Sequence, residues 1–191
     1  MLNKKQKYVI VVILLIIVSL TTGFLYQQLY SVIQKERYPI KFSQYVSQAS
    51  REFDVPEPII YATIKTESNF VHNAESSAGA RGLMQLMPST FEWLTTSVLK
   101  EHLPPEDITD PQTNIRYGTY MLSWLYNLLG DWETVFAAYN AGIGNVNSWL
   151  DNEQYSKNGK LTNIPFAETR EYVKRQLSNI KKYENLYYTG D

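Results

Sequence analysis

The stretch that decides the fold is residues 58–70, PIIYATIKTESNF. Ile60, Ile64 and Glu67 recur at spacings of four and three residues, so Glu67 continues the apolar stripe that a helix normally buries. Burial in apolar surroundings raises the pKa of a carboxyl group, which makes it a proton donor near neutral pH. The alternative is an ordinary glutamate that faces water at the end of a helix. The spacing alone leaves both interpretations open, and the residues downstream decide between them.

Four sequence blocks in a fixed order begin at Glu67. They are ESNF at 67–70, SSAGARGLMQLMP at 76–88, AAYNAG at 137–142 and FAETREYV at 166–173. Together they resemble the lytic transglycosylase family (soluble lytic transglycosylase-like and goose-lysozyme-related), over roughly residues 40 to 187. The resemblance implies a mainly α, lysozyme-like domain with little or no sheet that acts on peptidoglycan. Ile143 departs from the pattern, since many relatives have proline there, which affects the rigidity of a turn rather than the chemistry.

The resemblance also implies the reaction. The equivalent of Glu67 protonates the leaving oxygen of the β-1,4 bond between MurNAc and GlcNAc, and its carboxylate then takes the proton from the C6 hydroxyl of the same MurNAc. The product is a 1,6-anhydromuramyl end, so this lyase-type cleavage needs one acid. Most glycosidases use two carboxylates, but we expect Glu75, the next acid along the chain, to be a solvated loop charge. Two alternatives stay open: a muramidase in which water attacks, and a weakly active glycan-binding scaffold.

The first substrate-binding residues that the resemblance implies lie in the loop after Glu67. Ser76 matches a serine that helps to position the muramic residue, and a turn serine is an equal alternative. Met84 and Gln85 match residues of the sugar-binding groove, and the alternative for Met84 is a side chain that fills the core. We expect Gly79 and Gly82 to be structural, allowing backbone conformations or a close approach that a side chain would prevent.

The remaining substrate-binding residues come from the last two blocks. Tyr139 and Asn140 match residues that line the cleft opposite the acid, and the alternative for Tyr139 is a buried tyrosine with one hydrogen bond. Glu168 matches an acid at the cleft with a positioning role. The competing interpretation of Glu168 is an ion pair with Arg170 or Arg81.

The pattern of apolar residues, caps and turns predicts a helical domain after a break at Pro39. One helix is expected to begin with Asp54 as its cap, and a capping-box pattern at Ser89 is expected to open another, to about Leu99. Asn158 and Gly159 predict a turn and a small hairpin. The other expected helices cover 41–53, 110–129, 132–139, 146–150 and 166–187.

The N-terminal segment predicts a membrane anchor. Lysines precede an uncharged apolar run from Val9 to Leu25, which is close to the shortest length that spans a bilayer. The run lacks a convincing cleavage site, so we expect it to remain attached, with the lysines in the cytoplasm and the rest outside. The expected organisation is a cytoplasmic tip and anchor at 1–25, a stalk at 26–39 and a catalytic domain at 40–191, in a single-pass protein of the cell membrane whose catalytic domain is extracytoplasmic.

Composition narrows the choice of partners. Apart from the three N-terminal lysines among its 18 basic residues, the chain carries 15 basic and 19 acidic side chains, a net charge of −4, so nucleic acid is an improbable partner. The chain has no cysteine and only two histidines, too few for a zinc site, and no cofactor is expected. The expected partners are glycan strands of peptidoglycan and, through the N-terminal helix, a membrane; the sequence identifies no protein partner.

Overall fold

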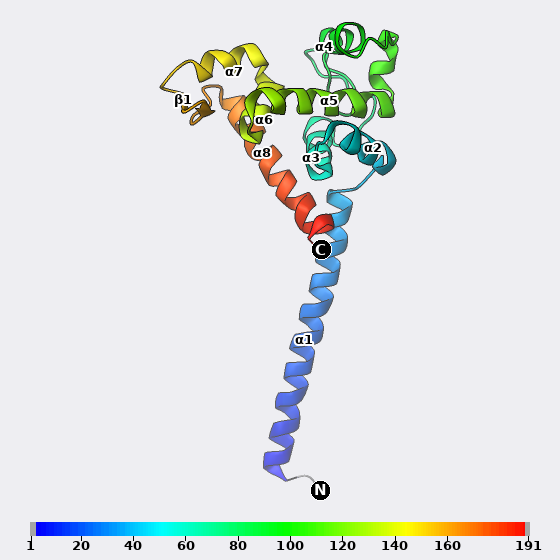
Figure 1. The fold of residues 1–191 in the computed structure, drawn as a ribbon. Helices are drawn as coiled ribbons and strands as arrows, with labels where there is room; N and C mark the ends of the chain where they lie inside the picture. The colour runs from blue at the N-terminus through cyan, green and yellow to red at the C-terminus, as the bar shows by residue number, and fades with distance from the viewer. Residues whose placement is uncertain (1–2, 190–191) are drawn as a thin grey trace. The chain divides into compact units, whose positions relative to one another are not determined.

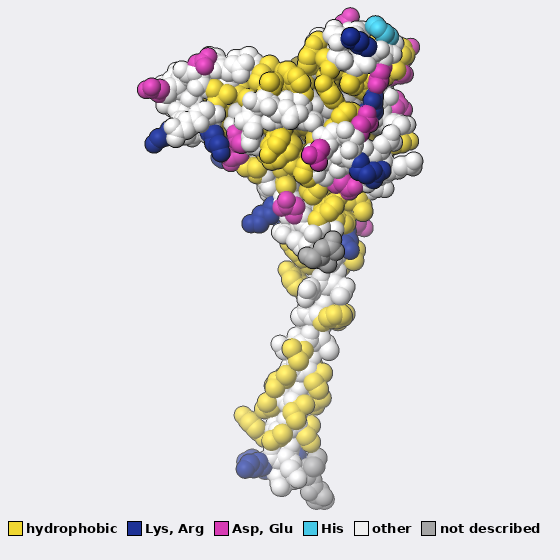
Figure 2. Space-filling model, viewed as in Figure 1, with side chains coloured by type: hydrophobic (Ala, Val, Ile, Leu, Met, Phe, Trp, Pro, Cys, Tyr) yellow, Lys and Arg dark blue, Asp and Glu magenta, His cyan; other side chains and the backbone are white. Residues whose placement is uncertain are grey.

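The computed structural model describes residues 3–189 and divides the chain into two compact units, Met1–Pro39 and Ile40–Asp191. The first unit contains one long helix, α1 (Lys4–Arg37), which begins at a capping box between Asn3 and Gln6. Helix α1 has no buried residue, and hydrophobic side chains cover much of its surface (Figure 2). By length and composition it is able to cross a membrane. It continues through most of the segment expected to form a stalk.

The second unit is built almost entirely from helices (Figure 1). The helices are α2 (Ser43–Phe53), α3 (Glu57–Glu67), α4 (Pro88–Trp93), α5 (Pro111–Leu129), α6 (Trp132–Ala141), α7 (Ile143–Leu150) and α8 (Ala167–Tyr183). Two π-helical turns, η1 (Leu94–Val98) and η3 (Glu184–Tyr188), extend α4 and α8, and a 3-10 turn, η2 (Pro105–Thr109), precedes α5. The only sheet in the described residues pairs β1 (Ser156–Lys157) with β2 (Lys160–Leu161). The mainly α prediction is confirmed.

Packing around α3 forms the main core of the domain. Helix α3 packs on α8, α8 also packs on α6, and α5 joins α6 to α2. Ile60 and Ile64 are fully buried, as their spacing predicts. A second cluster of buried residues lies where α4, η1 and η2 meet α5, and consists of Leu86, Phe91, Leu94, Ile108 and Tyr117. Together these contacts hold α3 against α8, and α8 in turn against α6.

Two of the predicted helix starts are wrong. Asp54 does not cap α3; it ends α2 in the left-handed conformation, with φ of 55°, and α3 begins after Pro56. Aspartate tolerates this conformation better than most residues, so a cap residue between two helices can belong to either. Ser89 does not form a capping box, because α4 begins one residue earlier at Pro88 and no side chain caps it. Proline is suited to the first turn of a helix, and it sets the start instead of the serine.

Other predicted boundaries are confirmed. The Asp110 side chain accepts a hydrogen bond of 2.9 Å from the Thr113 amide at the start of α5, and Gly130 ends that helix with φ of 73°. Asn158 and Gly159, with φ of 53° and 73°, connect the two strands of the hairpin. Positive φ at both positions matches the preferred two-residue hairpin turn.

Candidate active site

Glu67 is the last residue of α3 and is partly buried. Burial raises the pKa of its carboxyl group to about 7, although a hydrogen bond from Tyr172 and the charge of Arg175 both lower it. The position at the carboxyl end of a helix also disfavours a negative charge. None of the groups that shift this pKa is another carboxylate. Glu67 is therefore a lone acid that is substantially protonated near neutral pH.

Two residues of α8 form a hydrogen-bonded chain to Glu67. The Tyr172 hydroxyl donates to Glu67 Oε1 at 2.5 Å, and Gln176 Nε2 donates to the Tyr172 hydroxyl at 2.9 Å. Both side chains are buried, at 3% and 0% exposure. Burial and the charge of Glu67 hold the pKa of Tyr172 well above its usual value of 10. Tyr172 is therefore a neutral donor that holds one oxygen of Glu67 in place.

Tyr139, on α6, approaches the same carboxyl group. Burial is the main cause that raises its pKa well above 10, and the charge of Glu67 raises it further. Its hydroxyl donates to the backbone carbonyl of Met84 at 2.8 Å. Residues from α3, α6 and α8 therefore meet around Glu67, which is the convergence of polar groups expected at an active site.

The loop after α3 is held to the helices by hydrogen bonds. The Ser68 hydroxyl, directly after Glu67, donates to the Leu83 carbonyl at 2.8 Å. Asn114 of α5 accepts from the Met84 amide at 2.7 Å and donates to the Ile108 carbonyl at 2.6 Å. A Cβ atom at Gly82 would lie 2.2 Å from Asn114 Nδ2, so only glycine fits there. The expectation that Gly82 is structural is confirmed.

Met84 and Gln85 have different surroundings. Met84 is fully buried, and its sulfur packs against Gly118 of α5. The close approach of α5 leaves its side chain no accessible surface, as for a side chain that fills the core, and its carbonyl accepts from Tyr139. A contact between Met84 and a sugar stays a prediction. Gln85 is partly buried with φ of 48°, and its Nε2 donates to the carbonyls of Ala74 and Gly82. The structure therefore uses part of Gln85 to hold the loop.

Ser76 and Glu75 lie farther along this loop. The Ser76 hydroxyl accepts from the Ala80 amide at 3.0 Å, which is the bond of a turn serine. The same hydroxyl retains its own proton for donation, so a role toward substrate stays a prediction. Glu75 is exposed and pairs with Arg81 at 3.0 Å, which agrees with the expectation of a solvated loop charge.

Asn140 and Glu168 line a shallow hollow between the end of α6 and the start of α8, together with Ala141, Pro165, Phe166, Ala167 and Thr169. Asn140 is exposed, and its side-chain oxygen accepts from the Thr169 hydroxyl at 2.8 Å. Glu168 is exposed too. The proposed ion pairs of Glu168 are wrong, because Arg170 donates to the carbonyls of Ile164 and Pro165, and Arg81 pairs with Glu75.

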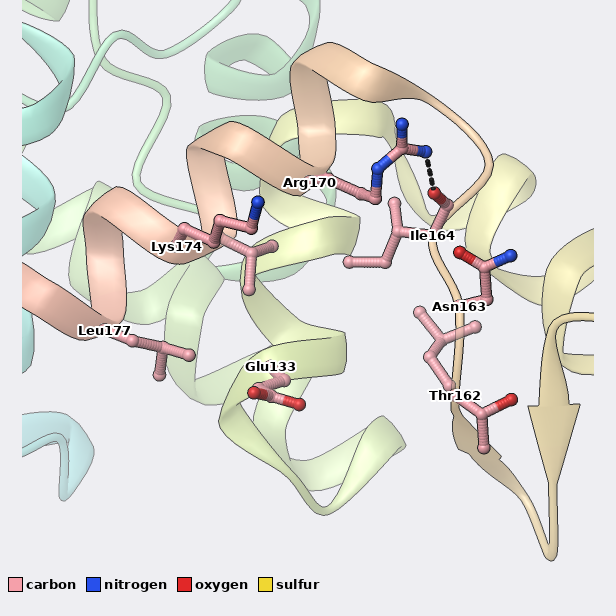
Figure 3. A pocket seen from close by; sticks show the side chains of 9 residues that line it. Glu133, Thr162, Asn163, Ile164, Arg170, Lys174 and Leu177 are labelled. Atoms are coloured by element: carbon pink, nitrogen blue, oxygen red, sulfur yellow. Dashed lines mark hydrogen bonds between the residues drawn. The ribbon is translucent and has the colours of Figure 1, made fainter.

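A separate pocket lies on another face of α8 (Figure 3). Its lining includes Arg170, Val173, Lys174 and Leu177, which recur at spacings of three and four residues and so share a face that excludes Tyr172 and Gln176. Glu133 and residues 161–164, at the end of the hairpin and just after it, complete it. This pocket does not include Glu67. Within residues 3–189, no group of three or more His, Cys, Asp or Glu side chains is arranged to hold a metal ion.

Sequence reasoning missed Tyr172, Gln176 and Arg175 as parts of the site. Tyr172 lies within the FAETREYV block, and Gln176 follows it by one helical turn. The available signal was Gln176, an amide at a position where α8 needs an apolar residue for packing. A polar residue on a buried face points to a hydrogen-bond partner, which here is Tyr172.

Comparison with known proteins places this arrangement in a family. The family model of the transglycosylase SLT domain matches residues 44–162, more than half of the chain. The chain therefore belongs to the transglycosylase SLT domain family. It is 34% identical over 165 residues to the soluble lytic murein transglycosylase of Escherichia coli K12, which covers 82% of this chain and 25% of that protein. It is 32% identical over 166 residues to membrane-bound lytic murein transglycosylase C of Salmonella arizonae, covering 75% and 46% respectively.

Solved structures give the same result. The 70 kDa soluble lytic transglycosylase of Escherichia coli matches with a TM-score of 0.71 and 32% identity, over 83% of this chain and 26% of that one. An inactive glutamate-to-glutamine mutant of lytic transglycosylase Slt from Pseudomonas aeruginosa matches with a TM-score of 0.69 and 29% identity, over 82% and 26%. The lysozyme-like helical fold is confirmed. The chain spans about a quarter of the length of these soluble relatives and less than half of the membrane-bound one.

Proposed function

We propose that this protein is a peptidoglycan lytic transglycosylase that cleaves the β-1,4 bond between MurNAc and GlcNAc without water. The observation that carries the proposal is Glu67, a lone carboxyl group whose pKa burial raises to about 7 and which Tyr172 holds through one oxygen. The named relatives are lytic murein transglycosylases, and one solved relative is inactive when a glutamate is replaced by glutamine. These facts support a single-acid reaction for this chain.

In the proposed reaction, Glu67 first acts as an acid and then as a base. Its proton moves to the glycosidic oxygen as the bond from C1 of MurNAc to that oxygen breaks, which leaves positive charge at C1. The C6 hydroxyl of the same residue then forms a bond to C1 and gives its proton to the Glu67 carboxylate. This step restores the acid and produces the 1,6-anhydro end. The intramolecular hydroxyl has a high effective concentration, so no second carboxylate is needed to activate water.

The substrate-binding part of the proposal uses residues of the loop after α3 and of α6 and α8. Ser76 and Gln85 in the loop, Tyr139 and Asn140 on α6, and Glu168 on α8 are proposed to bind the glycan. Asn140 and Glu168 are supported by their exposure and by their shared hollow. Met84 contributes by its carbonyl, which holds Tyr139.

The location of the protein is a further part of the proposal. The exposed apolar surface of α1 and its length support a single-pass anchor in the cell membrane. Lysines at the start of α1 support a cytoplasmic N-terminus, which leaves the domain at 40–191 on the extracytoplasmic side, next to its substrate.

Product analysis tests the proposed reaction. The full chain in detergent is incubated with purified sacculi, and the released fragments are examined by mass spectrometry. The expected products carry anhydro ends, which lack one water, and Glu67→Gln is expected to lower the rate by about 10²-fold or more because general acid catalysis is lost. Products with reducing ends would instead identify a muramidase. Binding to sacculi without cleavage, unchanged by Glu67→Gln, would identify a scaffold.

A further inference from the structure

Gln176 is a buried amide that the reaction alone does not explain. It lies on α8 one turn after Tyr172 and is 0% exposed. Its Nε2 donates to Tyr172, whereas its Oε1 is buried and has no hydrogen-bond partner within residues 3–189. A buried acceptor without a partner costs stability, which leucine, of similar size, would avoid. The amide at this position therefore needs a reason other than packing.

The direction of the hydrogen bonds supplies that reason. A phenol has one proton to donate, and an ionised carboxylate has only acceptors. Tyr172 must therefore give its proton to Glu67 Oε1, and Gln176 can bind Tyr172 only as a donor. The Gln176 N–H occupies the acceptor side of the phenol oxygen, so the phenol does not accept a proton from Glu67 in return. Leucine at this position would leave the phenol oxygen free to accept the Glu67 proton from Oε1.

A consequence follows for the two oxygens of Glu67. Oε1 accepts from Tyr172 in the protonated state of Glu67 as well, because the Gln176 N–H already occupies the phenol oxygen, which would otherwise accept the acid proton from Oε1. The acid proton must then be carried by Oε2. The oxygen that meets the glycosidic bond is therefore fixed before substrate binds, which is the kind of preorganisation that positions a catalytic group.

We propose that Gln176 is a positioning residue: by donating to Tyr172, it directs the Tyr172 proton to Oε1 of Glu67 and assigns the transferable proton to Oε2. The proposal rests on the proposed role of Glu67 as the general acid. The titratable and charged groups that face Glu67 are Tyr172 and Arg175 on α8 and Tyr139 on α6. The bond from Tyr172 lowers the pKa of Glu67, so weakening that bond must raise it.

Gln176→Leu, in the full chain in detergent, tests the proposal with sacculi as substrate. We expect kcat to fall about tenfold with little change in KM, because a part of the 10²–10⁴-fold contribution of general acid catalysis is lost. We also expect the alkaline limb of the pH profile to move to higher pH. The matched control is Asn179→Leu, which removes a nearby α8 amide that donates to Thr66 at 2.9 Å and not to Tyr172. This control should retain the kcat and the pH profile of the wild type.

A double-mutant cycle separates positioning from a general effect on folding. In a Tyr172→Phe background, Gln176→Leu should change kcat and the pH profile no further, because Gln176 acts through the tyrosine hydroxyl. An equal loss in both backgrounds, accompanied by an equal fall in Tm, would show a structural role and overturn the proposal.

A measurement that does not depend on activity completes the test. The Glu67 carboxyl group is followed by ¹³C NMR as the pH is changed, with its resonance assigned by comparison with Glu67→Gln. We expect its pKa to rise in both Gln176→Leu and Tyr172→Phe. An unchanged pKa in Gln176→Leu would overturn the inference. If the wild type cleaves no glycan while the pKa still rises, the proposed function fails and the directing role of Gln176 stands.

Discussion

The side chain of Glu67 lies among buried residues at the carboxyl end of α3, and both its surroundings and the helix dipole disfavour its charged form. The same environment that keeps the proton available for transfer makes the ionised residue costly to fold. Tyr172 and Arg175 reduce that cost without removing it. A substitution at Glu67 that stabilises the fold is therefore expected to remove activity, since active-site residues often lower stability in return for function.

Stability measurements on Glu67→Gln check this cost. In the wild type the pKa rises from 4.5 to about 7 on folding, so the folded state binds the proton more tightly. The stabilisation from this proton is complete below pH 4.5 and is lost as the pH rises to about 7. We expect Glu67→Gln to exceed the wild type in free energy of unfolding by roughly 2–3 kcal/mol at pH 8, and by little at pH 4.

Urea unfolding at the two pH values provides the measurement. Glu153→Gln, on an exposed residue, is the control and should stay within about 0.5 kcal/mol of the wild type at both pH values. Equal stability of Glu67→Gln and wild type at pH 8 would contradict the conclusion that burial disfavours the ionised form of Glu67.

The pH dependence of cleavage follows from the same group. In the proposed reaction, Glu67 must be protonated in the free enzyme in order to donate to the leaving oxygen. The rate kcat/KM is therefore expected to fall about tenfold for each pH increase of one above about 7, where the free enzyme loses this proton. Initial rates on solubilised glycan between pH 5 and 9 measure it. A decline centred near 4.5, the ordinary value for glutamate, would refute the assignment of this acid.

At the residue scale the sequence predicts Glu67 as the acid, but not the hydrogen bonds from α8 that hold it. The spacing of Ile60, Ile64 and Glu67 is local, so it indicates which side of α3 is buried. Tyr172 lies 105 residues away, and only the packing of α8 on α3 brings its hydroxyl to Glu67. The burial of Met84 likewise depends on how closely α5 approaches, which no local pattern contains.

At the scale of elements, the loop between α3 and α4 depends on two glycines with the same backbone conformation and different surroundings. Gly79 and Gly82 have φ of 86° and 82°. A Cβ atom at Gly79 would meet nothing within 4 Å. A Cβ atom at Gly82 would lie 2.6 Å from Asn114 Cγ and 2.8 Å from the Ile108 carbonyl oxygen, which is too close in both cases. Comparing the two glycines therefore separates the energetic cost of close packing between the loop and Asn114 from the cost of a positive φ.

Alanine at each glycine gives the test. Gly79→Ala should destabilise by about 1–2 kcal/mol, the cost of a left-handed conformation for a residue with Cβ. Gly82→Ala carries the same cost and an additional 1–3 kcal/mol, approximately, for overpacking against Asn114. Thermal unfolding compares the two variants. Equal losses would mean that Asn114 moves aside freely, and that its bonds to the loop contribute little.

Element boundaries show where sequence reasoning ends. Helix α5 is predicted at both ends because Asp110 and Gly130 each have one favourable role there. Asp54 has two, since it follows α2 and precedes α3 by only three residues. Two features make Asp54 end α2 instead of starting α3. One is Pro56, which precedes α3 and can be read from the sequence. The other is the packing of α2 on α3, which only the folded structure shows. No local sequence pattern predicts the π-helical turns after α4 and α8.

At the scale of the whole molecule, the absence of cysteine allows the proposed topology to be tested directly. Lys5→Cys and Ser178→Cys each place one thiol on an exposed residue, one at the start of α1 and one on the domain. In intact cells, a membrane-impermeant maleimide should label Ser178→Cys and spare Lys5→Cys until the membrane is opened. Labelling of Lys5→Cys alone would indicate the opposite orientation, and equal labelling of both variants would argue that α1 does not span the membrane.

Helix α1 also has more length than a bilayer requires. About 20 residues cross the apolar layer of a membrane, and α1 has 34. If it is anchored as proposed, the excess forms a rigid rod of roughly 20 Å at 1.5 Å per residue, not a loose chain. Such a helix is a short tether, so under the proposed function the glycan within reach of the domain at 40–191 would be the part nearest the lipid.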